Sequence, residues 1–215
     1  MAELRYRLLL AARSRAAIAP GVAWLFVLIG VYAYHPNDVR GSMGITALLL
    51  APITAWLAIA LTHAEPAPQR ELLTAGRAPV ATLATTAGAF ALLGTILGVA
   101  DIAWPIVSRA FDRPVTAADL LAGALAHTGC AVYGAALGTL VGARLVSRPA
   151  VAFTILVAVA IVAVPLFELA PALSPAAWTA DAMLEENAVL LPFAALAIHG
   201  LALTAAAATA LKRIA

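Results

Sequence analysis

The chain has 215 residues, of which 64% are hydrophobic and 11% charged, and its formal net charge is +2. Soluble domains have about 45–50% apolar and about 25% charged residues, so this composition excludes an ordinary soluble protein. With a mean hydropathy of +0.98, the sequence predicts a membrane protein.

Six segments are long and apolar enough to cross a bilayer, since one helical crossing needs about 20 apolar residues. We expect helices because the hydrocarbon core offers the backbone no water to bond with. The predicted fold class is all-α: a polytopic membrane protein with six transmembrane helices in a single transmembrane domain, residues 1–215. The predicted spans are residues 16–34, 43–62, 80–100, 120–142, 150–167 and 188–211.

The cations predict the orientation, because cytoplasmic flanks of membrane proteins collect Lys and Arg. With the N-terminus inside, only Arg40, Arg109 and Arg113 of the 13 Lys and Arg residues fall outside. Both termini are therefore predicted to be cytoplasmic. Most acids, among them Asp101 and Asp119, fall on the outer side, where we interpret them as solvated.

The first 15 residues, MAELRYRLLLAARSR, precede the first span. Leu4, Leu8 and Ala12 recur at helical spacing, while the arginines lie on other faces. This pattern fits an amphipathic helix in the cytoplasmic interface, with its arginines near anionic headgroups. It fits equally well a basic flank that only sets the orientation.

A charged segment, residues 65–77, separates the second and third spans. Pro66 and Pro68 suit only the first turn of a helix, whereas Gly76 and Pro79 bring a helix to its end. The predicted helix has about two turns, too few to be stable alone in water. It therefore needs packing, either against the spans or against a partner.

The pattern E-x-x-x-Q-R-E-L-L-x-x-G-R-x-P after two spans and a basic amphipathic N-terminus resembles the membrane subunits of type-2 ATP-binding cassette (ABC-2) exporters, especially small six-span permeases. The resemblance implies that residues 65–77 form a cytoplasmic coupling helix seated in an ATPase, and that residues 2–15 lie along the membrane. It also implies a homo- or heterodimer, and short re-entrant helices before the sixth span, where PALSPAAWTADAMLEEN lies. The residues that match the coupling pattern are Glu65, Gln69, Arg70, Glu71, Leu72, Leu73, Gly76 and Arg77.

The sequence contains no G-x-x-x-x-G-K-[ST] motif for cradling phosphates, so any ATPase is expected to be another polypeptide. The expected function is that of a permease subunit in the bacterial plasma membrane, working by alternating access. It would not itself be an enzyme: no residue is predicted to be catalytic, this chain binds no cofactor, and ATP and Mg belong to the partner ATPase. Besides this ATPase, the expected partners are a second permease subunit and the lipid bilayer, with no nucleic acid.

Polar residues inside the spans are candidates for a substrate path, because burying them in a bilayer is costly. We single out His127, Tyr133 and His199. Neutral histidines bonded to a neighbouring helix are the commoner alternative, and no metal-site spacing is present. If the histidines form the polar site, the chain is instead a secondary transporter or channel that acts without an ATPase.

Glycines four residues apart put bare stripes on the third and fourth spans and allow close approach of helices. These residues are Gly94, Gly98, Gly134, Gly138 and Gly142. Packing within the chain explains such stripes more often than dimerisation does. The single cysteine, Cys130, is interpreted as a small core residue.

Overall fold

The computed structural model describes residues 2–33, 37–66, 68, 79–142, 151, 154, 174–185 and 190–214. Regular structure in these residues is helical, and their one β-type pairing is an isolated bridge between Asn37 and Phe111. The elements are α1 (Ala2–Arg13), the 3₁₀ helix η1 (Arg15–Ala17), α2 (Ile18–Tyr32), α3 (Val39–Ala64), α5 (Pro79–Val107), α6 (Ala117–Leu140), α8 (Pro175–Leu184) and α9 (Leu190–Ile214).

Four helical stretches within the described residues are long and apolar enough to cross a membrane. They are Arg15–Tyr32, Val39–Ala64, Ala81–Val107 and Ala117–Leu140, with a shorter apolar stretch at Leu190–Leu203. These stretches confirm an all-helical membrane protein. The predicted span at 150–167 lies outside the described residues except at positions 151 and 154, so the count of six spans stays a prediction.

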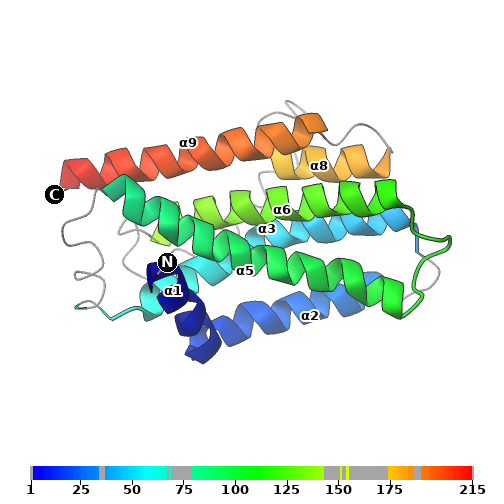
Figure 1. The fold of residues 1–215 in the computed structure, drawn as a ribbon, viewed down its shortest axis with the longest axis horizontal. Coiled ribbons are helices and arrows are strands. Elements are labelled where there is room, and N and C mark those ends of the chain that lie inside the picture. The colour runs from blue at the N-terminus through cyan, green and yellow to red at the C-terminus, as the bar shows by residue number, and fades with distance from the viewer. Residues whose placement is uncertain are drawn as a thin grey trace.

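The long helices lie side by side in one elongated bundle (Figure 1). At its centre α3 contacts α2, α5, α6 and α8, while α6 contacts α3, α5, α8 and α9. The end of α2, the start of α3 and the connection from α5 to α6 lie at the right end of the view, which we call the outer end. The last turn of α9 and the end of α3 lie at the left end, which we call the inner end.

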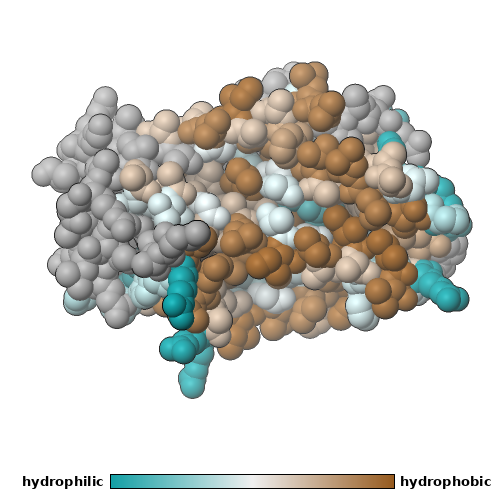
Figure 2. Space-filling model, in the orientation of Figure 1, coloured by the Kyte–Doolittle hydropathy of each residue, from teal (hydrophilic) through white to brown (hydrophobic). Residues whose placement is uncertain are grey.

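The outside of the bundle is apolar along its middle. On the face in Figure 2, hydrophobic side chains cover α2 and α5, and hydrophilic ones gather towards the two ends. Exposed large side chains include Phe26 of α2, Val99 of α5 and Leu201 of α9. A soluble protein rarely exposes such a surface, whereas a bilayer covers it.

Capping residues begin α3 and α6 at the outer end, and a proline begins α8 deeper in the bundle. Asp38 precedes α3 and accepts a hydrogen bond from the backbone N–H of Gly41. Thr116 and Asp119 form a reciprocal capping box at the start of α6, which satisfies backbone donors that a helix leaves free. Pro175 occupies the first turn of α8, where its missing N–H costs nothing.

One helix continues beyond its predicted end. The third span was expected to stop at Ala100, before the first charge, but α5 runs on to Val107 with Asp101 and Pro105 inside it. The charge does not end the helix because Asp101 has a polar partner inside the bundle, described below.

The predicted glycine stripes lie at contacts within the chain. A Cβ atom at Gly134 or Gly138 of α6 would come within 2.2 Å of the Ala51 carbonyl oxygen or 2.3 Å of the Ala55 carbonyl oxygen of α3. On α5, Gly94 faces Thr54 of α3. Gly142 is less crowded, since its nearest neighbour, Thr62, would lie 3.4 Å from an added Cβ. Cys130 is buried in the core between these helices, as predicted.

Candidate functional site

An acid and a histidine meet inside the helix bundle. Asp101 of α5 is 0% exposed and His127 of α6 is 2% exposed, and His127 Nε2 contacts Asp101 Oδ2 as an ion pair. Asp101 was interpreted as a solvated outer acid, which is wrong because this contact holds it in the interior. An ionisable pair at this depth is expensive to bury unless it is well bonded.

The other hydrogen bonds orient the two groups. Thr46 of α3 donates its hydroxyl hydrogen to Asp101 Oδ2 at 2.5 Å, and its oxygen lies 3.2 Å from His127 Nε2. His127 Nδ1 lies 2.7 Å from the Gly123 carbonyl oxygen, one turn earlier in α6. A carbonyl can only accept, so Nδ1 carries a hydrogen and Nε2 is the nitrogen that faces the acid.

Two buried oxygen atoms of this site, Oδ1 of Asp101 and the hydroxyl of Tyr32 at the end of α2, make no hydrogen bond of good geometry with the described residues. Tyr32 is 3% exposed, and its hydroxyl lies near the side chains of Ser42 and Thr46, within the electrostatic reach of Asp101. The cluster Tyr32, Ser42, Thr46, Asp101 and His127, which we call the junction cluster, thus draws on α2, α3, α5 and α6.

Gly98 lets α5 approach the histidine closely. An added Cβ there would lie 2.8 Å from His127 Cβ, and Asp101 follows three residues later on the same face of the helix. Sequence analysis selected Gly98 and His127 separately but missed Asp101. A usable signal was present: a lone acid in the apolar stretch TILGVADIAWPIV, and a lone histidine in the next span, are expected to pair.

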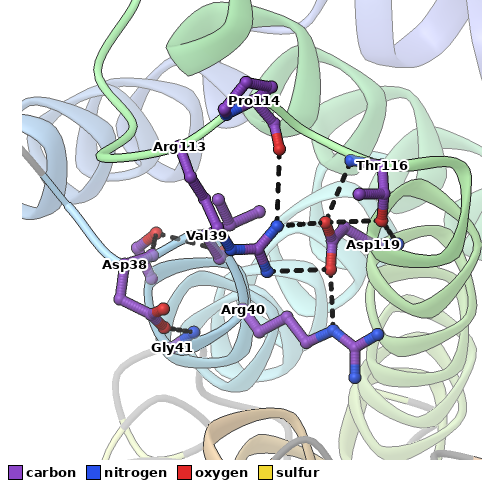
Figure 3. A network of polar contacts seen from close by, with 9 residues as sticks. Asp38, Val39, Arg40, Gly41, Arg113, Pro114, Thr116 and Asp119 are labelled. Carbon is purple, nitrogen blue, oxygen red and sulfur yellow. Dashed lines mark hydrogen bonds and ion pairs between the residues drawn. The ribbon is translucent and has the colours of Figure 1, made fainter.

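A second polar cluster fastens the outer end (Figure 3). Asp119 Oδ1 accepts from Arg40 Nε at 2.8 Å and from Arg113 Nη2 at 3.2 Å, while Oδ2 accepts from Arg113 Nη1 at 2.7 Å. The Thr116 hydroxyl and backbone N–H also donate to Oδ2. Asp119 is 1% exposed, so interpreting it as solvated is also wrong: two arginines and a helix cap compensate its burial.

Backbone contacts join the two outer connections above the junction cluster. Asn37 N–H donates to the Ala110 carbonyl at 3.0 Å, and Asp112 N–H donates to the Asn37 carbonyl at 3.0 Å. The Phe111 ring packs edge-on against the Tyr32 ring at a centroid distance of 6.0 Å. The outer connections therefore cover the end of α2 that carries the Tyr32 hydroxyl.

A third polar contact lies at the inner end. Arg7 of α1 and Glu65, which caps the end of α3, are each 3% exposed, and Arg7 Nη1 lies 3.6 Å from Glu65 Oε2. Burial of Tyr6, and secondly the negative charge of Glu65, raise the pKa of the Tyr6 phenol. The amphipathic helix α1 is thus joined to the first residue of the charged segment.

Replacing Glu65 by glutamine is expected to lower the pKa of Tyr6, because the substitution removes a nearby negative charge that disfavours tyrosinate. The contribution of burial remains, so the pKa should stay above that of a free phenol. A pH titration of tyrosinate absorbance measures the shift, with Tyr6→Phe identifying the Tyr6 signal. An unchanged titration in Glu65→Gln would contradict the placement of α1 against Glu65.

The structure does not bring the predicted substrate-path residues together. Among the described residues, no hydrogen bond or ion pair links His127, Tyr133 and His199: Tyr133 packs beside the core of α3 and α6, and His199 Nδ1 bonds to the Ala195 carbonyl of its own helix at 2.8 Å. Of the predicted ATPase-coupling residues, Glu65 is described. The others, Gln69, Arg70, Glu71, Leu72, Leu73 and Arg77, lie outside the described residues.

Within the part of the chain that the structure describes, no three His, Cys, Asp or Glu side chains gather as a metal site. Comparison of the chain with protein-family models, curated proteins and solved structures found no match.

Proposed function

We propose that this chain is the membrane-spanning permease subunit of an ATP-binding cassette exporter, driven by a separate ATPase. The observation that carries the proposal is the buried ion pair between Arg7 and Glu65. It joins α1 to the residue at which the charged segment 65–77 begins. A push on that segment would therefore also reach α1, which is the linkage that a motor bound at this end requires.

The path of the chain supports six crossings. In Figure 1, α6 finishes towards the inner end, whereas α8, the next described helix, lies in the outer half of the bundle. This placement supports a crossing at the predicted span 150–167. With six crossings, both termini and the segment 65–77 lie on the same side, which the distribution of cations makes the cytoplasmic side.

The short helix α8 supports the same proposal. It is buried against the start of α3, where an added Cβ at Gly44 would lie 2.9 Å from Met183 Cβ, and it also contacts α9. This position supports the short re-entrant helix before the last span that the resemblance to small six-span permeases implies. Two such permeases, identical or not, would enclose the export path in the bacterial plasma membrane, and ATP and Mg would bind to the ATPase.

Co-purification tests the proposal. An affinity tag on this chain, expressed in its own host and extracted in mild detergent, should retain an ATP-hydrolysing subunit of separate sequence. Retention of ATPase activity above that of an untagged extract supports the proposal. A chain that is well folded and fully dispersed, yet retains no ATPase at any detergent or salt concentration, would overturn it.

The double variant Leu72→Asp with Leu73→Asp is expected to lose at least tenfold in ATPase retention, since two apolar anchors contribute about 2–3 kcal/mol to such an interface. The matched control places the same two charges in another predicted inner connection, as Leu145→Asp with Val146→Asp. Size-exclusion chromatography in detergent checks that both variants fold. Equal retention in both double variants would contradict the coupling assignment.

A transporter or channel without an ATPase is the second candidate, and the buried Asp101–His127 pair is the observation that favours it. A chain reconstituted alone in vesicles would then move protons or ions without ATP. Under the first proposal, the same vesicles should stay as tight as protein-free ones.

A further inference from the structure

The contacts of the junction cluster fix how many protons the Asp101–His127 pair holds. His127 Nδ1 faces the Gly123 carbonyl oxygen and carries one hydrogen. His127 Nε2 and Asp101 Oδ2 are in direct contact, and two acceptors in contact need a hydrogen between them. The pair therefore holds two protons and is neutral overall, whichever atom binds the shared one.

Neutrality is what the surroundings require. Asp101 is 0% exposed, His127 is 2% exposed and Thr46 is 0% exposed, so a net charge on the pair would lack water to stabilise it. Losing the shared proton would leave an uncompensated carboxylate facing a nitrogen lone pair. The closed junction therefore retains this proton.

Hydration of the site changes the number of protons that the Asp101–His127 pair holds. In water a carboxyl has a pKa of about 3.9 and an imidazole about 6.5, so above about pH 6.5 separated groups of these types hold one proton between them instead of two. Water reaching the cluster would find two oxygen atoms that make no hydrogen bond of good geometry with the described residues, Asp101 Oδ1 and the Tyr32 hydroxyl. These atoms are the places where the first water molecules would bind.

We propose that the Asp101–His127 pair is a proton-binding site whose occupancy follows the opening and closing of the helix junction. On opening, the hydrogen bond between His127 and Asp101 breaks, and the shared proton leaves to water. On closing, one proton is taken up from water and the contact re-forms. This inference goes beyond the proposed export function and holds whether or not an ATPase drives the opening.

Other ionisable groups near the site do not change the number of protons that the Asp101–His127 pair holds. On α2, the Tyr32 phenol faces the cluster and is protonated at neutral pH. Arg40 of α3 and Asp119 of α6 lie further out and are paired with each other. On α6, Cys130 lies one turn further in as a buried thiol. The apolar residues of α8 and α9 that pack against this core are Ala176, Met183 and Leu196, and the buried Thr179 of α8 is polar but not ionisable.

The balance between the closed and open junction is expected to depend on pH in one direction. Between about pH 3.9 and about pH 6.5 the closed and separated states hold the same two protons, so closure does not depend on pH. Above about pH 6.5 the separated state holds one proton fewer, so each added pH unit lowers the ratio of closed to open protein tenfold, which corresponds to about 1.4 kcal/mol. Alkaline conditions thus favour the open, hydrated junction.

Spectroscopy on the whole chain tests the site directly. The chain with ¹⁵N-labelled histidine, in lipid nanodiscs at about pH 8, should show one of two signatures. Either both ring nitrogens of His127 are protonated, or the carboxyl of Asp101 gives the infrared band of a protonated acid. His127→Gln identifies the nitrogen signals and Asp101→Asn the carboxyl band. If neither signature is present at about pH 8 in the wild-type chain, the proposal is overturned.

Unfolding equilibria provide a second test, with a matched control. The wild-type chain should lose stability as the pH rises above about 6.5, because its folded state holds one proton more than its unfolded state. In Asp101→Asn, the unfolding equilibrium constant should rise less steeply with pH, by a factor of ten per pH unit. His199→Gln, which removes a histidine bonded only within its own helix in the described structure, should keep the wild-type slope. An Asp101→Asn slope equal to that of the wild type would overturn the proposal. If this variant does not fold, the wild-type spectra alone decide.

Discussion

Replacing Gly134 by alanine is expected to destabilise the folded chain by about 2–3 kcal/mol. The new Cβ would lie 2.2 Å from the carbonyl oxygen of Ala51, an atom of helical backbone that cannot move without displacing α3. The contact between α3 and α6 forms the centre of the bundle, so its separation should also loosen α5 and α9. Thermal unfolding in detergent, followed by tryptophan fluorescence, measures the loss.

Gly88 provides the matched control, because an added Cβ there meets no atom within 4 Å. Alanine favours helix by about 1 kcal/mol over glycine, so Gly88→Ala should leave the chain unchanged or slightly more stable. The two variants make the same chemical change in long apolar helices and are expected to differ in sign. If Gly134→Ala proves as stable as Gly88→Ala, α3 and α6 do not pack as described.

The spacing of the glycines predicted which faces of two helices are bare, but not which helix each face meets. Gly134 and Gly138 face α3, while Gly98 faces His127 of α6. Spacing along one helix is a local property, whereas the partner depends on how four or five helices assemble. Apolar helices of similar composition offer the sequence no way to rank these pairings.

Asp101 was missed for the same reason, because the sequence does not reveal which helices lie next to each other. A charge after an apolar run normally marks the end of a span, and a window of apolar residues stops there. Asp101 instead continues α5, because His127 and Thr46 from two other helices surround its carboxylate. The histidine could be selected from the sequence, since its rarity in a span is visible locally. The acid that completes the site becomes recognisable only when the helices are placed together.

At the inner end, sequence analysis selected Glu65 for its place in a charged segment and left two interpretations of the first fifteen residues open. The buried contact with Arg7 links these two features, which are 58 positions apart in the chain. Neither periodicity nor composition relates residues at such a distance. The distribution of arginines predicted that both segments lie on one side of the bilayer, and the contact adds that they are joined.

Replacing Asp119 by asparagine is expected to cost about 2–4 kcal/mol at neutral pH. Breaking a buried ion pair typically costs about 3–5 kcal/mol, and we place this case lower because the Arg113 side chain is 36% exposed and can turn to water. Asparagine presents an N–H₂ group where Arg40 and Arg113 need acceptors, so at least one guanidinium loses its bond. The capping box of α6 is weakened in the same step. Chemical denaturation in mixed micelles measures the change.

The exposed Asp112, in the connection between α5 and α6, supplies the control: Asp112→Asn removes an equal charge and should change stability by less than about 0.5 kcal/mol.

A second substitution separates the charge effect from a general loosening of the connection. The cost of Asp119→Asn comes mainly from the charge if it arises because Arg40, whose side chain is only 16% exposed, loses the Asp119 carboxylate. In that case, adding Arg40→Gln should recover part of the lost stability. The two substitutions would then be less costly together than the sum of each alone, which a double-mutant cycle measures. Additive costs would mean that Asp119 acts through the cap of α6 rather than through its charge. Hydrogen exchange at the Asp112 amide, which bonds to Asn37, then reports whether the outer connections have separated above Tyr32.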